Sequence, residues 1–152
     1  MNKEKIAFIP RQYLAVIAVL LAIMMSVLDG TIMNIALPTL AHDFDVTPST
    51  AIWIVNAYQL IITMTLLSFA SLGDIYGYRR IFLIGISIFV GASLACTLST
   101  SFWMLTAARV IQGFGAACVM SVNTALIRLI YPPQILGRGM GVNAMVVAVS
   151  AA

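Results

Sequence analysis

Charged residues are scarce in this sequence. Its 152 residues include 8 Lys and Arg and 5 Asp and Glu, so 9% of the chain is charged while 62% is hydrophobic. An ordinary globular domain has about 25% charged residues, which cover its surface. The net charge of +3 is scattered and forms no basic patch of the kind that binds nucleic acid. The composition therefore excludes a soluble domain and a nucleic-acid-binding protein, and it indicates a chain that crosses a membrane several times.

Metal-binding and catalytic side chains are also sparse. His42 is the only histidine, and Cys96 and Cys118 lie inside apolar stretches without a CxxC spacing. Neither a zinc site nor a disulfide framework is expected, and both cysteines are interpreted as small buried hydrophobic residues. The sequence also lacks a Ser-His-Asp set, a phosphate-binding or dinucleotide-binding loop, and a lysine within an apolar stretch. We therefore expect neither an enzyme nor a protein with a metal or other cofactor.

Long apolar runs dominate the chain instead. A helix needs about 20 apolar residues to cross the hydrocarbon layer of a membrane. The sequence predicts four such spans and an incomplete fifth, at residues 13–40, 51–72, 81–98, 102–130 and 137–152. Thr47 followed by Pro48 is typical of a helix start, and Pro132 with Pro133 interrupts the helix before them. The predicted fold class is an all-α, polytopic transmembrane helix bundle.

The basic residues predict how this bundle is oriented. With the N-terminus in the cytoplasm, seven of them flank the spans on the cytoplasmic side: Lys3, Lys5, Arg11, Arg79, Arg80, Arg128 and Arg138. The outer loops, 41–50 and 99–101, contain neither lysine nor arginine. Cytoplasmic loops of membrane proteins have an excess of these residues. We therefore expect a multi-pass protein of the cytoplasmic membrane with its N-terminus inside the cell.

Two ionisable residues lie within the predicted spans, Asp29 in the first and Arg109 in the fourth. An ionisable side chain in a span costs at least ~2.5–3.5 kcal/mol on insertion scales, and such residues usually mark ion pathways or proton relays. The first span ends near Pro38 and the fourth begins near Phe102, both at the outer surface. At 1.5 Å per helical residue, Asp29 then lies about 13 Å and Arg109 roughly 10 Å below that surface. The two charges would face each other if their helices are neighbours. A buried carboxylate beside an arginine can take up and release a proton, and a purely structural ion pair is the alternative.

Further residues of the first two spans are candidates for lining a cavity. Asn56 and Gln59 lie three residues apart on the second span, so they share one helix face. Met25 and Met33 fall on the Asp29 face of the first span, where flexible apolar side chains suit a promiscuous pocket. Plain packing is the alternative interpretation of the methionines.

The fourth span carries a second polar side chain and a row of small residues. Gln112 lies on the same side as Arg109, and both are interpreted as functional. The small residues follow at a spacing of four: Gly113, Ala117, Ser121 and Ala125. Such rows let helices approach one another closely, so this row is expected to serve packing.

Three segments of the chain form motifs. Residues 28–38 read LDGTIMNIALP, residues 72–80 read LGDIYGYRR, and residues 109–117 read RVIQGFGAA. They are similar to motifs of the major facilitator superfamily: a first-helix motif, a cytoplasmic loop motif and a fourth-helix motif. The first of them resembles the drug:proton antiporters with fourteen spans, the EmrB/QacA group. The resemblance covers nearly the whole chain.

The loop motif departs from the family pattern at three positions. Ala70 stands where the family usually has glycine, and Ile75 and Tyr78 stand where it usually has basic residues. The retained positions, with Arg80 as a partial replacement for the missing charge, make up an expected gating loop of Gly73, Asp74, Gly77, Arg79 and Arg80. The glycines permit a tight turn. The aspartate can pair with a basic group at a helix end, and such a contact would favour one of two conformations.

The resemblance implies a transporter that works by alternating access, with a cavity between two helix bundles. It implies exchange of an inward-moving proton for an outward-moving amphipathic or cationic compound. In that scheme Asp29 is the proton or cation site, and Arg109 modulates its charge. Gln112 and Asn34 would be polar cavity or hinge residues, and Thr31 belongs to the same first-helix motif. A half-bundle of the superfamily has six spans, so the chain is expected to be the N-terminal part of a longer transporter domain.

Two other functions stay open at this stage. One is transport of a specific metabolite, by symport or antiport, within the same superfamily. The other is a membrane partner subunit without transport activity, which would not need charges inside its spans. The expected partners are a small-molecule substrate, protons and the lipid bilayer, with a periplasmic adaptor protein as well if the source is a Gram-negative bacterium.

Overall fold

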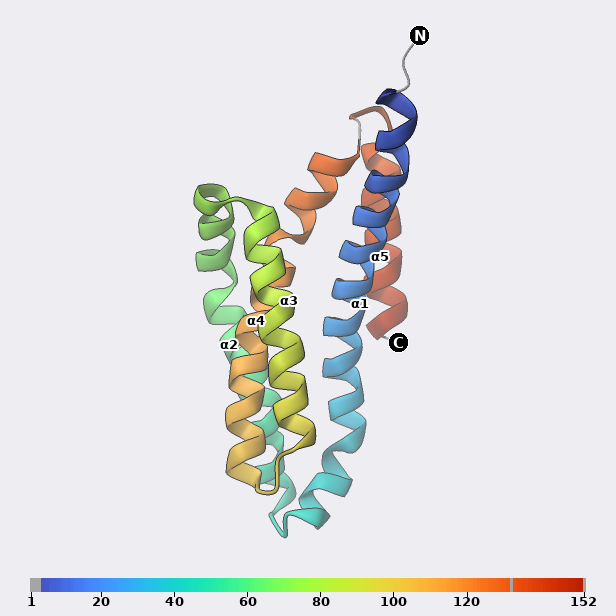
Figure 1. The fold of residues 1–152 in the computed structure, drawn as a ribbon. Coiled ribbons are helices and arrows are strands. Elements are labelled where there is room, and N and C mark those ends of the chain that lie inside the picture. Colours follow the sequence, from blue (N-terminus) through green and yellow to red (C-terminus); the bar gives the residue numbers. More distant parts are fainter. Residues whose placement is uncertain (1–3, 132, 152) are drawn as a thin grey trace.

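The computed structural model describes residues 4–131 and 133–151, and these residues are helical apart from short turns (Figure 1). The elements are α1 (Glu4–Asp43), α2 (Pro48–Tyr76), α3 (Tyr78–Thr97), α4 (Phe102–Ile130), a single 3-10 turn η1 (Pro133–Ile135) and α5 (Leu136–Ala151). The predicted all-α fold class is therefore confirmed.

Four of these helices are long and apolar enough to cross a membrane. They comprise Leu14–Asp43 of α1 and the whole of α2, α3 and α4, while α5 is a shorter apolar helix of 16 residues. Large apolar side chains on their outer faces, such as Leu67 and Trp103, are exposed, as expected for helices surrounded by lipid.

The helix ends follow from local chemistry. Thr47 caps α2 by accepting a hydrogen bond from the Thr50 backbone N–H at 3.3 Å, and Pro48 is the first helical residue, so the predicted start is confirmed. Ser101 caps α4 in the same way through Met104. Between α2 and α3 the chain turns at Gly77, whose φ of 94° is a conformation that side chains with a Cβ rarely adopt.

The first helix extends past the proline at which the sequence suggested an end. Pro38 removes its own N–H from the helical hydrogen bonds and crowds the carbonyl group four residues earlier, but α1 continues to Asp43. Beyond the proline, Leu40 and Phe44 pack against a buried cluster that includes Ile54 and Leu105. This packing stabilises the extra turn and could not be read from local sequence.

The fourth helix is the centre of the bundle. It packs against both α2 and α3, and most of its residues between Leu105 and Ile127 are buried. The closest approach to α3 is at Gly115, where an added Cβ would lie 2.6 Å from the backbone nitrogen of Phe89. Gly113 gives a similar close approach to α2, because its Cβ would lie 3.1 Å from the Tyr58 carbonyl oxygen. Gly113 of the predicted small-residue row therefore serves helix packing. The tightest contact, however, is made by Gly115, which does not belong to that row.

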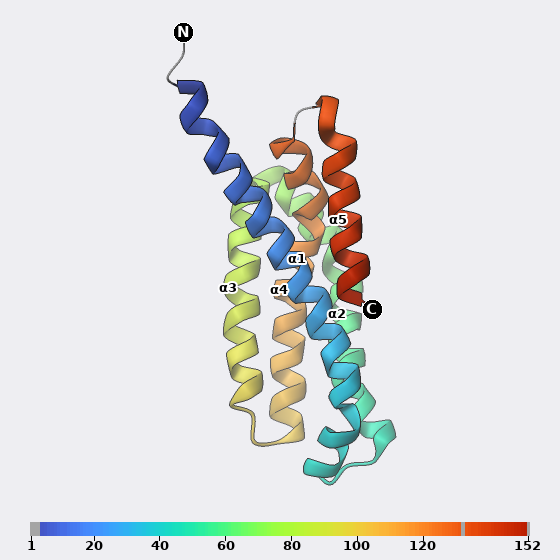
Figure 2. The same cartoon turned by 90° about the vertical axis from the view of Figure 1, so that its right-hand side faces the viewer.

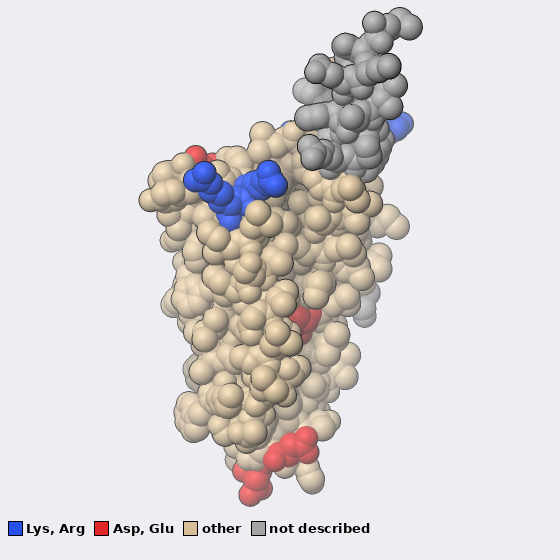
Figure 3. Space-filling view, in the orientation of Figure 1, with Lys and Arg blue, Asp and Glu red and all other residues tan. Residues whose placement is uncertain are grey.

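The first helix lies obliquely across this three-helix core, with α5 beside it (Figure 2). The antiparallel order places the α2–α3 turn and the C-terminal end of α4 at one end of the bundle (Figure 1). Exposed Arg79, Arg80 and Arg128 belong to these segments, and we call this the basic end. Asp43, the last residue of α1, and Asp45, in the α1–α2 connection, belong to the opposite, acidic end. Figure 3 shows this separation of charge on one face of the molecule.

Candidate functional site

An ion pair joins α1 to α4 in the interior of the bundle. The Arg109 Nη1 group donates a hydrogen bond to Asp29 Oδ2 at 2.5 Å. The Arg109 side chain is 5% exposed and the Asp29 side chain 20% exposed, so both charged groups are largely buried inside the bundle. The structure therefore brings together the two charges that the sequence placed at similar depths.

The buried Gln112 amide hydrogen-bonds to the second oxygen of the Asp29 carboxylate. Gln112 lies one helical turn after Arg109, and its Nε2 group donates to Asp29 Oδ1 at 3.1 Å. Gln112 is 1% exposed. Its oxygen faces α3, where the Cys96 thiol donates to Oε1 at 3.6 Å. Both carboxylate oxygens are thus hydrogen-bonded from α4, which is what stabilises a buried charge.

Tyr58 of α2 also belongs to this cluster. The Arg109 guanidinium carbon lies 5.7 Å from the centre of the Tyr58 ring, within the range of a cation–π contact. The Tyr58 hydroxyl donates to the backbone carbonyl of Ser26 on α1 at 3.3 Å. This residue was not predicted from the sequence. The signal that could have found it is its position directly before Gln59, in a span of mostly apolar residues. Buried tyrosines usually have a partner for their hydroxyl group.

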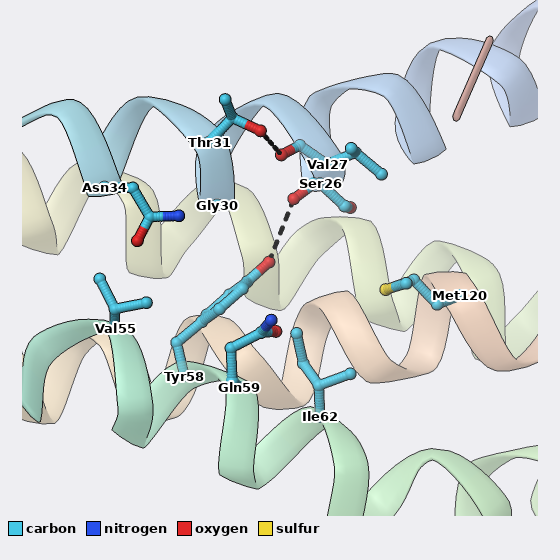
Figure 4. A pocket seen from close by; sticks show the side chains of 10 residues that line it. All are labelled: Ser26, Val27, Gly30, Thr31, Asn34, Val55, Tyr58, Gln59, Ile62 and Met120. Carbon is cyan, nitrogen blue, oxygen red and sulfur yellow. Dashed lines mark hydrogen bonds between the residues drawn. The ribbon is translucent and has the colours of Figure 1, made fainter. Parts of the chain in front are cut away.

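Two cavities meet different faces of α1 near this cluster. The first, which we call the ion-pair cavity, has a volume of about 320 Å³ and is lined by Asp29, Arg109 and Gln112 together with Met33. The second, the Tyr58 cavity, has a volume of about 240 Å³ (Figure 4). Its polar lining residues are Ser26, Thr31, Asn34, Tyr58 and Gln59.

The candidate residues are therefore divided between separate places. Asn34 and Gln59 line the Tyr58 cavity (Figure 4), whereas Asp29 lines the ion-pair cavity. Met25 is exposed and lines a smaller apolar cavity with Phe89. Asn56 lies on the exposed surface of α2.

Two polar contacts connect α5 to the rest of the bundle. Thr31 donates to its own helix at Val27 and approaches the Ser150 carbonyl oxygen of α5 at 3.4 Å. The Asn123 amide of α4 donates to Asn143 Oδ1 of α5 at 2.9 Å. Neither partner on α5 was predicted. The sequence of a short apolar helix does not by itself show which of its faces is buried.

In the expected gating loop, the aspartate is bonded to a tyrosine and not to the basic group that the sequence suggested. Among the described side chains, Asp74 accepts a hydrogen bond from the Tyr78 hydroxyl and forms no ion pair with a basic residue. Tyr78 stands where the family usually has a basic residue and follows Asp74 by four positions, across the turn at Gly77. Gly73 is buried beneath the same ring, since an added Cβ would lie 2.9 Å from Tyr78. Arg79 and Arg80 are exposed at the basic end, apart from this contact.

In the part of the chain that the structure describes, no three His, Cys, Asp or Glu side chains gather to form a metal site. The arrangement is instead a buried, hydrogen-bonded ion pair in a transmembrane bundle.

Comparison with known proteins gives the family. A family model described as Major Facilitator Superfamily matches residues 19–152. The chain is 58% identical over 144 residues to the uncharacterized transporter YebQ of Escherichia coli, covering 95% of the chain and 32% of that protein. It is 34% identical over 139 residues to the riboflavin transporter RibZ of Clostridioides difficile, covering 91% of the chain and 30% of the relative. It is 40% identical over 132 residues to the drug efflux pump JefA of Mycobacterium tuberculosis, covering 86% and 26%.

The chain spans about a third or less of the length of each of these relatives. The family match, in contrast, extends over most of the chain. With its four long apolar helices, the protein is a multi-pass membrane protein and belongs to the major facilitator superfamily.

Proposed function

We propose that the protein exports amphipathic or cationic compounds in exchange for protons, by alternating access. The observation that carries this proposal is the buried cluster of Asp29, Arg109 and Gln112, which joins two transmembrane helices. Ionisable residues inside spans usually mark ion pathways or proton relays. The similarity to a relative named as a drug efflux pump supports export, while the charges inside the spans argue against a subunit without transport activity.

Asp29 is the proton site in this proposal. While it is charged, Arg109 and Gln112 hold α1 against α4 through both carboxylate oxygens. A proton on Asp29 removes the charge that balances Arg109, so the conformation with these helices in contact loses its main electrostatic advantage. Protonation thereby favours a second arrangement of α1, as alternating access requires.

The substrate site includes the Tyr58 cavity. Asn34 and Gln59 offer amide groups, while Ile62 and Met120 offer apolar contacts (Figure 4). A few polar groups in a mainly apolar pocket suit an amphipathic compound, and a flexible methionine tolerates different shapes.

We also propose that the basic end faces the cytoplasm and that the membrane is the cytoplasmic one. Exposed arginines of the α2–α3 turn and of α4 lie at this end, and the connections at the acidic end contain neither lysine nor arginine. This is the distribution that the positive-inside rule describes.

The proposal is tested by replacing Asp29→Asn in the full-length protein and measuring efflux of a fluorescent cationic dye from energised cells. We expect efflux to be lost while the amount of protein in the membrane is unchanged, because asparagine keeps the size of the side chain but cannot release a proton. Asp29→Glu is the matched control, since it keeps a carboxylate that can bind and release a proton at the same position. Normal efflux by the Asp29→Asn protein would contradict the assignment of the proton site.

Transport of a specific metabolite is the second candidate, supported by the similarity to a protein named as a riboflavin transporter. The two candidates differ in what an imposed proton gradient does. In proteoliposomes containing the full-length protein, an inward proton gradient drives a dye outward if the protein is an exporter. Inward accumulation of riboflavin under the same gradient, without movement of the dye, would favour the metabolite transporter.

A further inference from the structure

The ion-pair cavity extends from the centre of the bundle to the acidic end. At its inner limit it is lined by Asp29, Arg109 and Gln112, and at the other limit by Phe44 and Ser99. Phe44 lies in the α1–α2 connection, and Ser99 in the α3–α4 connection. The cavity therefore links the buried carboxylate to the connections at one end of the molecule, between α1, α3 and α4.

The α3 side of this cavity offers polar groups to water, whereas Met33, Ala36 and Leu40 make the α1 side apolar outward of Asp29. Ser93, Cys96 and Thr97 of α3 share one helix face at spacings of three and four, and they line the cavity between Gln112 and Ser99. The hydroxyl groups of Thr97 and Ser99 donate to backbone carbonyls, which leaves their oxygen lone pairs free to accept further hydrogen bonds. The volume of about 320 Å³ is several times the roughly 30 Å³ that one water molecule occupies in the liquid.

The charged pair itself borders the cavity at its inner limit. Asp29 and Arg109 both line the cavity, and the Asp29 side chain is 20% exposed. Water in the cavity can therefore contact the Asp29 carboxylate.

The charges at the outer limit favour protons. The exposed carboxylates of Asp43 and Asp45 flank Phe44 in the sequence, and the two connections, 41–50 and 99–101, carry no lysine or arginine. Negative charge around the mouth of a cleft raises the local concentration of cations, including protons.

We propose that the ion-pair cavity is a water-filled proton pathway, which leads from the acidic end to Asp29 along a face of α1 different from the one that borders the Tyr58 cavity. This inference rests on the proposed function of Asp29 as the proton site. Protons then reach α1 through the ion-pair cavity and substrate through the Tyr58 cavity, so the two do not compete for the same space.

Cys96 provides a test that does not depend on transport. In full-length protein carrying Cys118→Ser and no other cysteine than Cys96, a small membrane-impermeant cationic methanethiosulfonate reagent is added to the outer face of intact cells. We expect Cys96 to react, because its thiol lines the cavity. The matched protein with Cys96→Ser and Cys118 retained is expected to stay unlabelled, since Cys118 is 2% exposed in the α3–α4 interface. Absence of labelling of Cys96 from the outer face overturns the pathway.

A second variant tests the route by function. Ser93→Leu should make the middle of the cavity apolar, and Ser87→Leu is the matched control on an exposed position of the same helix. In proteoliposomes we expect Ser93→Leu to slow proton-driven dye transport by about tenfold or more. The dissociation constant for the dye should stay within about twofold of the parent value, because the Tyr58 cavity is untouched. Unchanged transport by Ser93→Leu overturns the pathway.

These outcomes are separable from the proposed function. Loss of efflux in Asp29→Asn together with an unreactive Cys96 overturns the pathway and leaves the proton site in place. Labelling of Cys96 together with normal efflux by Asp29→Asn overturns both, since a hydrated cavity that ends at a group without a role in proton exchange is not a proton pathway.

Discussion

At the scale of single residues, the central feature is the ion pair between Asp29 and Arg109. Its contribution to the free energy of unfolding depends on both charges being present. Asp29 accepts from Arg109 and from Gln112, so each of its oxygens is satisfied. Removing one charge leaves the other buried without a counter-charge, which is more unfavourable than removing both. Stability and transport are therefore expected to respond differently to substitutions in this cluster.

Arg109→Gln should destabilise the protein by about 3–5 kcal/mol, because the Asp29 carboxylate then lacks its counter-charge. The double variant Asp29→Asn, Arg109→Gln should recover much of this loss, since two amides can hydrogen-bond to each other. Thermal unfolding in detergent, monitored by tryptophan fluorescence, measures both. Additive effects of the two single substitutions would show that the charges do not interact in the folded protein.

Tyr58 should act on the ion pair through its ring and on α1 through its hydroxyl group. Tyr58→Phe keeps the ring beside Arg109 but loses the bond to Ser26, whereas Tyr58→Leu loses both. We expect a modest decrease in stability of about 0.5–1.5 kcal/mol for the phenylalanine variant. The leucine variant should also change the pH dependence of dye efflux, whereas the phenylalanine variant, which keeps the ring beside Arg109, should not. Equal pH profiles for Tyr58→Leu and Tyr58→Phe would contradict a role for the ring.

At the scale of helices, close backbone approach determines how α3 and α4 pack. Gly115 and Gly85 face each other across this interface, and the carbonyl oxygen of Gly85 would lie 2.8 Å from a Cβ at Gly115. Small residues are the usual means by which transmembrane helices come this close. The position of α4, and with it of Arg109, depends on this contact.

Gly115→Ala should therefore lower the unfolding temperature, because the added methyl group meets backbone atoms of α3 that cannot move aside. A cost of roughly 1–3 kcal/mol is expected from overpacking of this kind. Gly91→Ala on α3 is the control, since a methyl group added there would have nothing within 4 Å. The contact would be unimportant if both variants unfolded at the same temperature in detergent.

At the scale of the whole molecule, the separation of charge between the two ends predicts how the protein lies in the membrane. In protein without its native cysteines, Asp45→Cys should react with an impermeant thiol reagent added outside the cell. Arg80→Cys should react only after the membrane is opened, because it belongs to the basic end. The reverse pattern of labelling would place the N-terminus outside.

Much of the fold could be predicted because apolar length, helix caps and charge distribution are local properties of the sequence. The similar depth of Asp29 and Arg109 could be predicted too, because depth along a helix axis depends only on sequence position. Their meeting required in addition that α1 and α4 be neighbours, which the structure shows. The rotation of each helix about its axis does not, since it results from packing at residues such as Gly115. For that reason Tyr58 was missed, and Asn34 was assigned to the same site as Asp29 although it faces a different cavity.

The placement of the two cavities on one helix has a thermodynamic consequence. Asp29 and Thr31 are two residues apart on α1 but border different cavities, so a proton and a substrate can be bound together. Any influence between them must then pass through the position of α1. In such a reciprocal system, the factor by which a proton weakens substrate binding equals the factor by which the substrate weakens proton binding. Exchange of the two would then be an antagonism between neighbouring sites on α1, transmitted by movement of that helix.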